Sequence, residues 1–202
     1  MKKDPMSATP LAAALTATYR PHATPLEVFK MARKRYLAGR HLCLGELAKE
    51  AGISRGTLQR WVGNKDLLLD EILWSMARPA FEKAVRETPN TGLEHIIGVH
   101  RAFMTAILSD RAVQHFIKNE QHYALRILTN TSSGVSKRVV QLTAAHLREQ
   151  QTSGHIQLHA SAEELAEFII LANQAIIYSD SVSGRSPAIE KACSLIRMLL
   201  AS

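Results

Sequence analysis

Apolar residues recur every three or four positions along most of this chain of 202 residues, and that spacing predicts amphipathic helices. A first helix is expected after Thr24, because threonine caps a helix and the proline that follows it suits the first turn. Its apolar face continues to Leu37, and Gly39 is expected to end it. No segment shows the sustained alternation of apolar and polar residues that a β-strand requires, so the chain is predicted to be all-α.

Further helices are placed by the glycines, prolines and capping residues between the periodic segments. Asn64 is expected to cap a long helix, and Pro79 is expected to end or kink it, because proline lacks the amide hydrogen that a helix interior needs. The remaining predicted helices span residues 43–50, 54–61, 91–109, 110–128, 132–151, 161–182 and 187–200.

The two short helices belong to one stretch, LGELAKEAGISRGTLQRW, which runs from Leu44 to Trp61. Ala48 is small enough for a second helix to cross close over the first, and Gly52 permits the left-handed backbone of a tight turn. Ser54 is expected to cap the second helix and to leave its N-terminus facing a phosphate. This spacing predicts a DNA-binding helix-turn-helix, with a helical hairpin that has a solvated polar face as the alternative.

The polar residues of the second short helix suit the edges of base pairs. Arg55 and Arg60 can donate to guanine, and Gln59 can pair with adenine. The methyl group of Thr57 suits the methyl group of thymine, and Gly56 lets the backbone approach the groove closely. The segment is therefore predicted to be a recognition helix for the major groove of double-stranded DNA.

The positive charge of the chain is concentrated around this segment. Lysine and arginine total 25 against 18 aspartates and glutamates, which gives a formal net charge of +7. Residues 1–78 hold 13 basic and 7 acidic residues, so +6 of this charge lies in the first part of the chain. A basic region of this kind favours a polyanionic partner, and a solvated basic face is the alternative.

The stretch from residue 25 to 75 resembles the DNA-binding domain of the TetR family of bacterial transcription regulators. The core GISRGTL carries the resemblance, together with the Lys65–Asp66 pair that opens the next helix. The resemblance implies that Lys65 contacts a phosphate while the recognition helix reads base pairs. The DNA-contact residues implied in this way are Arg40, His41, Gly45, Arg55, Gly56, Thr57, Gln59, Arg60, Trp61 and Lys65.

Three positions depart from the family pattern. Gln59 stands where a tyrosine is frequent, and Val62 stands where a phenylalanine is common. Leu42 and Cys43 replace the usual threonine cap of the preceding helix. The first departure predicts an unusual base preference or one missing phosphate contact, and the others predict a less stable domain.

The resemblance implies a C-terminal domain for ligand binding and dimerisation, and the C-terminal helices are compatible with it. The helices at 161–182 and 187–200 are amphipathic, and two copies of each would form the four-helix interface of a homodimer; a monomer core is the alternative. Polar side chains within apolar helices predict a cavity for an amphipathic effector of the fatty-acyl, acyl-CoA or acyl-lactone class, although each alone can be satisfied by backbone or water. The predicted ligand-binding residues are His100, Phe103, Met104, Phe116, His122, Tyr123, Asn173, Gln174, Ile177 and Tyr178.

Metal and enzyme chemistry find little support in the sequence. His155 and His159 lie in a predicted loop with no cysteine or carboxylate nearby to complete a ligand set, so no metal site is predicted. Cys193 lies on an apolar helix face without an adjacent base, and the sequence contains neither a nucleophile elbow nor a glycine-rich phosphate loop. We therefore predict no cofactor and no enzymatic activity.

The sequence thus predicts a cytoplasmic protein in three parts. Its two cysteines are far apart and fit a reducing compartment, and no run approaches the roughly 18 apolar residues of a membrane span. Residues 1–24 are predicted to be a flexible arm and residues 25–65 a three-helix helix-turn-helix domain. Residues 66–202 are predicted to be a larger helical domain for ligand binding and dimerisation.

The predicted function is that of a ligand-responsive transcriptional regulator, with a repressor favoured, that binds a palindromic operator as a homodimer. An architectural or ligand-independent DNA-binding protein with the same headpiece is one alternative. A small-molecule carrier or an enzyme in which the headpiece is vestigial is the other.

Overall fold

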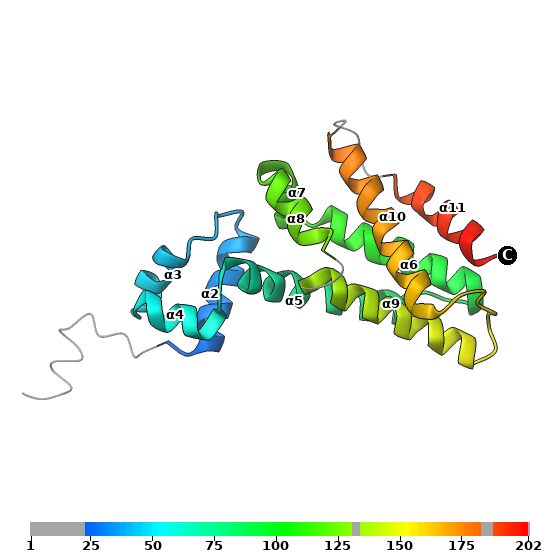
Figure 1. The fold of residues 1–202 in the computed structure, drawn as a ribbon, viewed down its shortest axis with the longest axis horizontal. Coiled ribbons are helices and arrows are strands. Elements are labelled where there is room, and N and C mark those ends of the chain that lie inside the picture. The colour runs from blue at the N-terminus through cyan, green and yellow to red at the C-terminus, as the bar shows by residue number, and fades with distance from the viewer. Residues whose placement is uncertain (1–22, 131–133, 183–187, 202) are drawn as a thin grey trace, which may run out of the picture.

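The computed structural model describes residues 23–130, 134–182 and 188–201, and these described residues form ten helices and no strand. The all-α prediction is therefore confirmed. Figure 1 shows an elongated molecule with α2, α3 and α4 at one end and α10 and α11 toward the other. Apart from its last two positions, the predicted N-terminal arm lies outside the described residues. The helices are α2 (Pro25–Leu37), α3 (Leu44–Ala51), α4 (Arg55–Val62), α5 (Lys65–Glu87), α6 (Gly92–Ser109), α7 (Arg111–Asn119), α8 (Gln121–Leu128), α9 (Gly134–Thr152), α10 (Ala162–Val182) and α11 (Ile189–Leu200).

Helix α2 begins at the predicted cap. The Thr24 hydroxyl accepts a hydrogen bond from the Glu27 amide at 3.2 Å, and the Glu27 carboxylate accepts one from the Thr24 amide at 2.6 Å. This reciprocal pair satisfies amide groups that have no partner within the helix. Val28, Ala32 and Tyr36 follow at helical spacing and are buried. Helix α2 is therefore the support against which α3 and α4 pack.

Helices α3 and α4 form the predicted helix-turn-helix. Gly52 takes a left-handed φ of 67° at the end of α3, and Ser54 caps α4. Leu47 and Leu58 are fully buried, and Ala48 is buried with them. Full burial of a leucine contributes roughly 1.5–3 kcal/mol, so apolar packing orients the polar face of α4 outward.

Helix α5 continues through Pro79 to Glu87, so it does not end at this proline. The proline is exposed, whereas Ala77, Phe81 and Ala84 extend the buried stripe of the helix against the rest of the protein. The burial of this stripe outweighs the local cost of an interior proline, which is roughly 3 kcal/mol.

The helix predicted over 110–128 is two helices, because Glu120 leaves the helical conformation between α7 and α8, with φ −123° and ψ 44°. The apolar period continues across the break, since Phe116 and Ala124 are both buried. Periodicity alone therefore could not separate the two helices. The break places the Glu120 carboxylate next to the N-terminal domain.

We call the larger part of the protein, from α5 to α11, the body. It is built around α5, α6, α9 and α10. Helix α9 packs on α5 and α10, and α6 packs on α5 and α11. Ile97, Leu147 and Ile169 are among its most completely buried side chains. Because α5 also packs on α2, this single helix belongs both to the N-terminal domain and to the body. None of the helices that the structure describes is long and apolar enough to cross a membrane.

Candidate DNA-contact surface and internal cavity

Helix α4 presents a polar face to solvent. Its cap, Ser54, accepts a hydrogen bond from the Thr57 amide at 3.0 Å, which fixes the start of the helix. Arg55, Gln59 and Arg60 are exposed, and their spacing places them on one side of the helix. The Arg60 guanidinium lies 3.4 Å from the Thr57 hydroxyl. The arrangement is that of a short helix with donors on the face opposite its buried leucine.

Other predicted DNA contacts lie around this helix. Arg40 and His41 are exposed in the turn between α2 and α3, and Gly45 lies in the first turn of α3. Gly56 is exposed in the first turn of α4. These positions surround α4 with backbone and basic groups that suit phosphate contacts.

Two of the predicted DNA contacts have partners within the protein. Trp61 is partly buried and packs against the hydrophobic core, so it supports α4. Lys65, the first residue of α5, lies 3.4 Å from the Glu120 carboxylate and 3.5 Å from His41. The Lys65 ammonium is therefore directed toward the body in this arrangement.

Six helices of the body, α5 to α10, line a cavity of about 120 Å³. One buried water needs roughly 10–15 Å³, so the cavity has room for a molecule of several heavy atoms. Leu73 and Met76 of α5 form one wall, and Phe103 and Met104 of α6 form another. None of the described residues that line the cavity is charged. The space therefore suits an uncharged, mostly apolar group.

Three polar side chains interrupt the apolar lining, and they are Ser136, Asn173 and Gln174. The Gln174 amide nitrogen donates to the Ser136 hydroxyl at 3.2 Å and also to the Leu128 carbonyl. The Gln174 amide oxygen and the Asn173 amide nitrogen are buried and make no hydrogen bond to any described residue. Buried polar atoms without a partner cost free energy. A ligand with hydrogen-bonding groups would supply partners on this side of the cavity.

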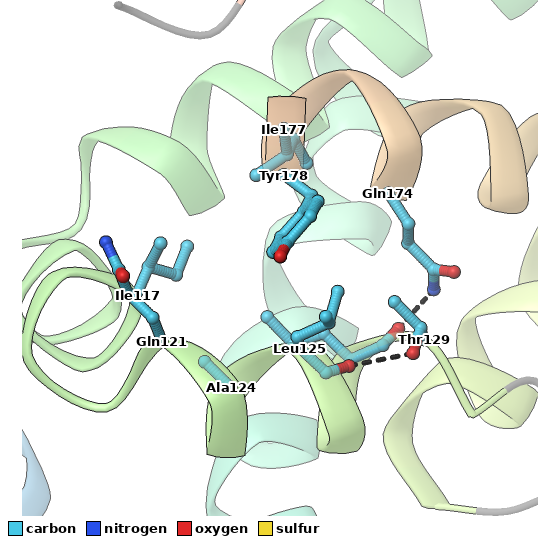
Figure 2. A pocket seen from close by; sticks show the side chains of 9 residues that line it. Ile117, Gln121, Ala124, Leu125, Thr129, Gln174, Ile177 and Tyr178 are labelled. Atoms are coloured by element: carbon cyan, nitrogen blue, oxygen red, sulfur yellow. Dashed lines mark hydrogen bonds between the residues drawn. The ribbon is translucent and has the colours of Figure 1, made fainter. Parts of the chain in front are cut away.

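A smaller hollow adjoins the cavity between α8 and α10 (Figure 2). Tyr178 points into it from α10 toward Leu125, and Gln174 reaches from α10 to the end of α8. The hollow and the cavity share Ile117, Leu128, Gln174 and Ile177. Gln174 therefore borders both the hollow and the cavity.

The structure brings six of the ten predicted ligand-binding residues to the cavity: Phe103, Met104, Phe116, Asn173, Gln174 and Ile177. Tyr178 lines the adjoining hollow, and His100 is buried near Asn173 without lining either space. His122 is exposed, and Tyr123 binds the start of α5, so both lie away from the cavity.

Sequence reasoning missed much of the cavity wall. Leu73 and Met76 of α5 and Val139 of α9 sit in ordinary apolar stripes, which carry no sign that they border a space. Ser136 offered a signal, because it stands at helical spacing with the apolar Val139 and Val140, and the structure buries it. Among the described residues, no group of three or more histidines, cysteines, aspartates or glutamates is arranged to hold a metal ion.

Comparison with known families decides the identity of the body. Residues 91–201 match the family model described as "Tetracyclin repressor-like, C-terminal domain", and the match spans more than half of the chain. This chain belongs to the TetR family. The family predicted from the helix-turn-helix is thus confirmed, and the chain is a transcriptional regulator and not an enzyme. DNA and a small-molecule effector are the partners that the TetR family implies.

Two solved structures are similar to this chain to different degrees. The TetR-family transcriptional repressor QsdR of R. erythropolis is similar with a TM-score of 0.82 and 26% sequence identity, over 88% of this chain and 94% of that chain. A putative transcriptional regulator from Rhodococcus sp. RHA1 has a TM-score of 0.54 and 14% identity, over 86% of this chain and 93% of its own, which is a similarity of fold alone. Comparison with curated proteins gives no match.

The last two helices of this TetR-family chain carry apolar side chains on their outer faces. On α10, Phe168 is 58% exposed and Leu171 is 43% exposed, whereas Ile169 on the opposite side is buried. On α11, Leu195 and Met198 are three residues apart and exposed by 39% and 64%. Apolar residues at such spacing form a continuous face, so α10 and α11 do not bury all of their apolar surface within one copy.

The buried histidines of this TetR-family chain favour their neutral form. Burial lowers the pKa of His100 to about 4, with Arg101 acting in the same direction and the amide of Asn173 opposing it. Burial also lowers the pKa of His146, and the neighbouring His95 adds to this effect. Both imidazoles are held in the protein without a full set of hydrogen bonds from described residues.

We expect acid to destabilise the protein through His100. Its pKa of about 4 in the folded protein lies below the value of 6.5 for a free histidine, so the unfolded chain binds the proton first. The contribution of neutral His100 to the free energy of unfolding is complete above pH 6.5. It is lost as pH falls toward 4, by up to about 3 kcal/mol. Urea unfolding between these pH values should show this loss.

The matched variants are His100→Gln, which removes the buried titrating group, and His159→Gln, which removes an exposed one. The first should flatten the pH dependence, leaving the parts due to His146 and to carboxylates such as Asp66 and Glu71, whose pKa values are lowered in the folded protein. The second should leave the pH dependence unchanged. An equal pH dependence in wild type and His100→Gln would contradict the assignment.

Proposed function

We propose that this protein is a homodimeric repressor that binds a palindromic operator and releases it when a small amphipathic molecule fills the cavity. The observation that carries this proposal is the position of α5. It begins at Lys65 beside the recognition helix, and its Leu73 and Met76 line the cavity. Helix α5 would have one arrangement that suits DNA binding and another that does not. A molecule that binds the second arrangement more tightly lowers DNA affinity, and the difference between its affinities for the two arrangements sets the size of the effect.

The DNA side of the proposal uses α4 as the recognition helix. Arg55, Gln59 and Arg60 would read base edges in the major groove, with Thr57 and Gly56 in close approach. Two copies of α4 would enter grooves about one helical turn apart or more, which requires an operator with two-fold symmetry. The phosphate contacts would come from the residues around α4, namely Arg40, His41, Gly45 and Lys65.

The dimer would form through α10 and α11. The exposed apolar side chains of these helices, among them Phe168 and Leu195, are removed from water when a second copy covers them. Two copies of each helix make a four-helix interface around a two-fold axis. The same two-fold axis would set the distance between the two recognition helices.

The chemistry of the cavity narrows the effector class. A fatty-acid carboxylate or the phosphates of acyl-CoA, if placed in the cavity, would find no cation among the described residues that line it, which is costly. An acyl lactone instead has a neutral head whose carbonyl oxygens accept hydrogen bonds that Asn173 can donate. Its chain suits the apolar walls. We therefore propose a neutral acyl compound, with an acyl lactone as the representative.

Native mass spectrometry combined with thermal unfolding tests the proposal. The purified protein should be a dimer, and an acyl lactone of medium chain length should bind it and raise its unfolding temperature. The free fatty acid of the same chain length is the matched ligand control and should bind much more weakly. The variant Val113→Phe, which fills the cavity, should remain dimeric and lose the lactone response.

Each part of the proposal can fail separately in this experiment. A monomeric protein contradicts the interface through α10 and α11. Equal binding of the acid and the lactone contradicts the neutral head group. A lactone response that survives in Val113→Phe shows that the compound binds outside the cavity.

A further inference from the structure

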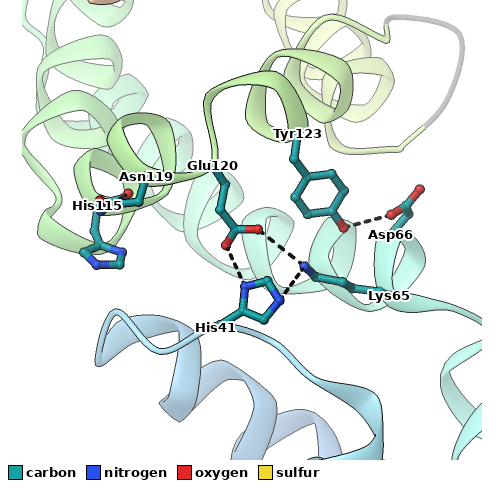
Figure 3. A network of polar contacts seen from close by, with 7 residues as sticks. All are labelled: His41, Lys65, Asp66, His115, Asn119, Glu120 and Tyr123. Carbon is teal, nitrogen blue, oxygen red and sulfur yellow. Dashed lines mark hydrogen bonds and ion pairs between the residues drawn. The ribbon is translucent and has the colours of Figure 1, made fainter.

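Glu120 links the body of the protein to its DNA-contact surface. It lies between α7 and α8, and its carboxylate faces Lys65 and His41 across the space between the two parts of the protein (Figure 3). One carboxylate oxygen is 3.4 Å from Lys65 Nζ, and the other is 3.4 Å from His41 Nδ1. Lys65 Nζ is also 3.5 Å from His41 Nε2. The three side chains therefore form one closed polar group.

Lys65 has a second partner on the body. Its Nζ lies 4.4 Å from the centre of the Tyr123 ring, a distance at which a cation is attracted to the ring face. Tyr123 is held in place by its hydroxyl, which donates to the Asp66 carboxylate at 2.8 Å. Only 28% of the Lys65 side chain is exposed. The ammonium is thus bound by the body before any DNA phosphate is present.

We propose that Glu120 competes with DNA phosphate for Lys65 and His41 and thereby lowers the DNA affinity of the protein. This inference rests on the proposed function, in which both side chains contact phosphate. A carboxylate and a phosphate are anions that accept hydrogen bonds from the same donors. Lys65 can reach a phosphate only by leaving Glu120, so part of the favourable free energy of phosphate binding is offset.

The cavity-lining helices determine where this carboxylate lies. Phe116, one turn before Glu120, lines the cavity, and Ala124, one turn after it, lines the adjoining hollow. A molecule that moves α7 or α8 therefore moves Glu120 relative to Lys65. Glu120 is a positioning residue, and it connects the cavity to the DNA-contact surface by a second route beside α5.

Fluorescence anisotropy with a random-sequence duplex about three helical turns long measures this competition, because phosphate contacts do not depend on sequence. Glu120→Gln should bind about twofold to fivefold tighter than wild type, the increase expected from releasing an ion pair of this exposure. The dependence of log affinity on log salt should also become steeper by roughly 0.9 for each additional phosphate that the protein neutralises. Glu120 makes no side-chain cap for α8, so the amide should leave the fold intact.

Three further variants separate the direct competition from a general effect of charge. Glu120→Asp keeps the charge but withdraws it by one methylene group, so it should also bind more tightly than wild type. Glu46→Gln removes a carboxylate of the N-terminal domain that pairs with Arg35, and it should not reproduce the increase in salt dependence. In a His41→Ala, Lys65→Ala background, Glu120→Gln should give no increase in affinity.

The outcomes distinguish a failure of the competition at Glu120 from a failure of the proposed phosphate contacts on which it depends. If wild type fails to bind the duplex, or if the His41→Ala, Lys65→Ala protein binds as well as wild type, the proposed phosphate contacts are wrong. If that protein binds more weakly but Glu120→Gln matches wild type or binds less tightly, the competition is refuted. A full increase in affinity that persists without Lys65 and His41 also refutes it.

Discussion

Replacing Arg55 or Arg60 with alanine is expected to weaken operator binding by about 1–3 kcal/mol for each base that the side chain no longer reads. Both side chains are exposed on α4, whose opposite side is held by the fully buried Leu58. A bidentate interaction of arginine with guanine discriminates between bases, so the loss of affinity should be larger on the operator than on random DNA. Operators selected from a random pool and titrated with each variant provide the measurement.

Lys49→Ala is the matched control for this prediction, because Lys49 is an exposed basic residue of α3 that is not among the proposed DNA-contact residues. It should reduce binding to operator and random DNA by the same small factor. Unchanged operator binding in both arginine variants would remove α4 from the reading surface. Selected sites that lack two-fold symmetry would favour an architectural DNA-binding protein instead.

Replacing Leu58 with alanine is expected to destabilise the N-terminal domain by about 2–5 kcal/mol. Leu58 is fully buried, and it is the buried residue of α4, so its truncation leaves a cavity where this helix packs. DNA binding should be lost together with the packing of α4. Urea unfolding followed by circular dichroism, with DNA binding measured in parallel, tests both effects.

Leu58→Met conserves most of the volume and should cost less than about 1.5 kcal/mol while keeping DNA affinity. This variant separates a defect in packing from a defect in DNA recognition. If Leu58→Ala unfolded at the same urea concentration as wild type, α4 would not depend on this leucine for its position.

The N-terminal domain could be predicted from the sequence because its signals act within a few residues. Thr24, Ser54 and Asn64 each accept a hydrogen bond from an amide three positions later, and these three caps fix the starts of α2, α4 and α5. Gly52 supplies the left-handed turn between α3 and α4. Such local chemistry is the same in any tertiary context.

Helix boundaries in the body depended on interactions between distant residues. Pro79 carries a local signal to stop a helix, yet buried residues beyond it continue α5. Glu120 carries no local signal to stop, yet the chain breaks there and the carboxylate meets Lys65, which is 55 positions away. Neither outcome follows from nearby residues, because the energy that decides it comes from packing and charge across the fold.

By itself the sequence determined the helical class, the helix-turn-helix and the family, since periodicity, caps and the GISRGTL core are properties of short segments. Only the tertiary structure decided which apolar residues enclose a space, since Leu73 of α5 and Val139 of α9 look like any core residue until six helices converge around them. It also decided that Tyr123 faces Lys65 rather than the cavity. A cavity forms where the side chains of several helices leave a volume unfilled, so no single segment encodes it.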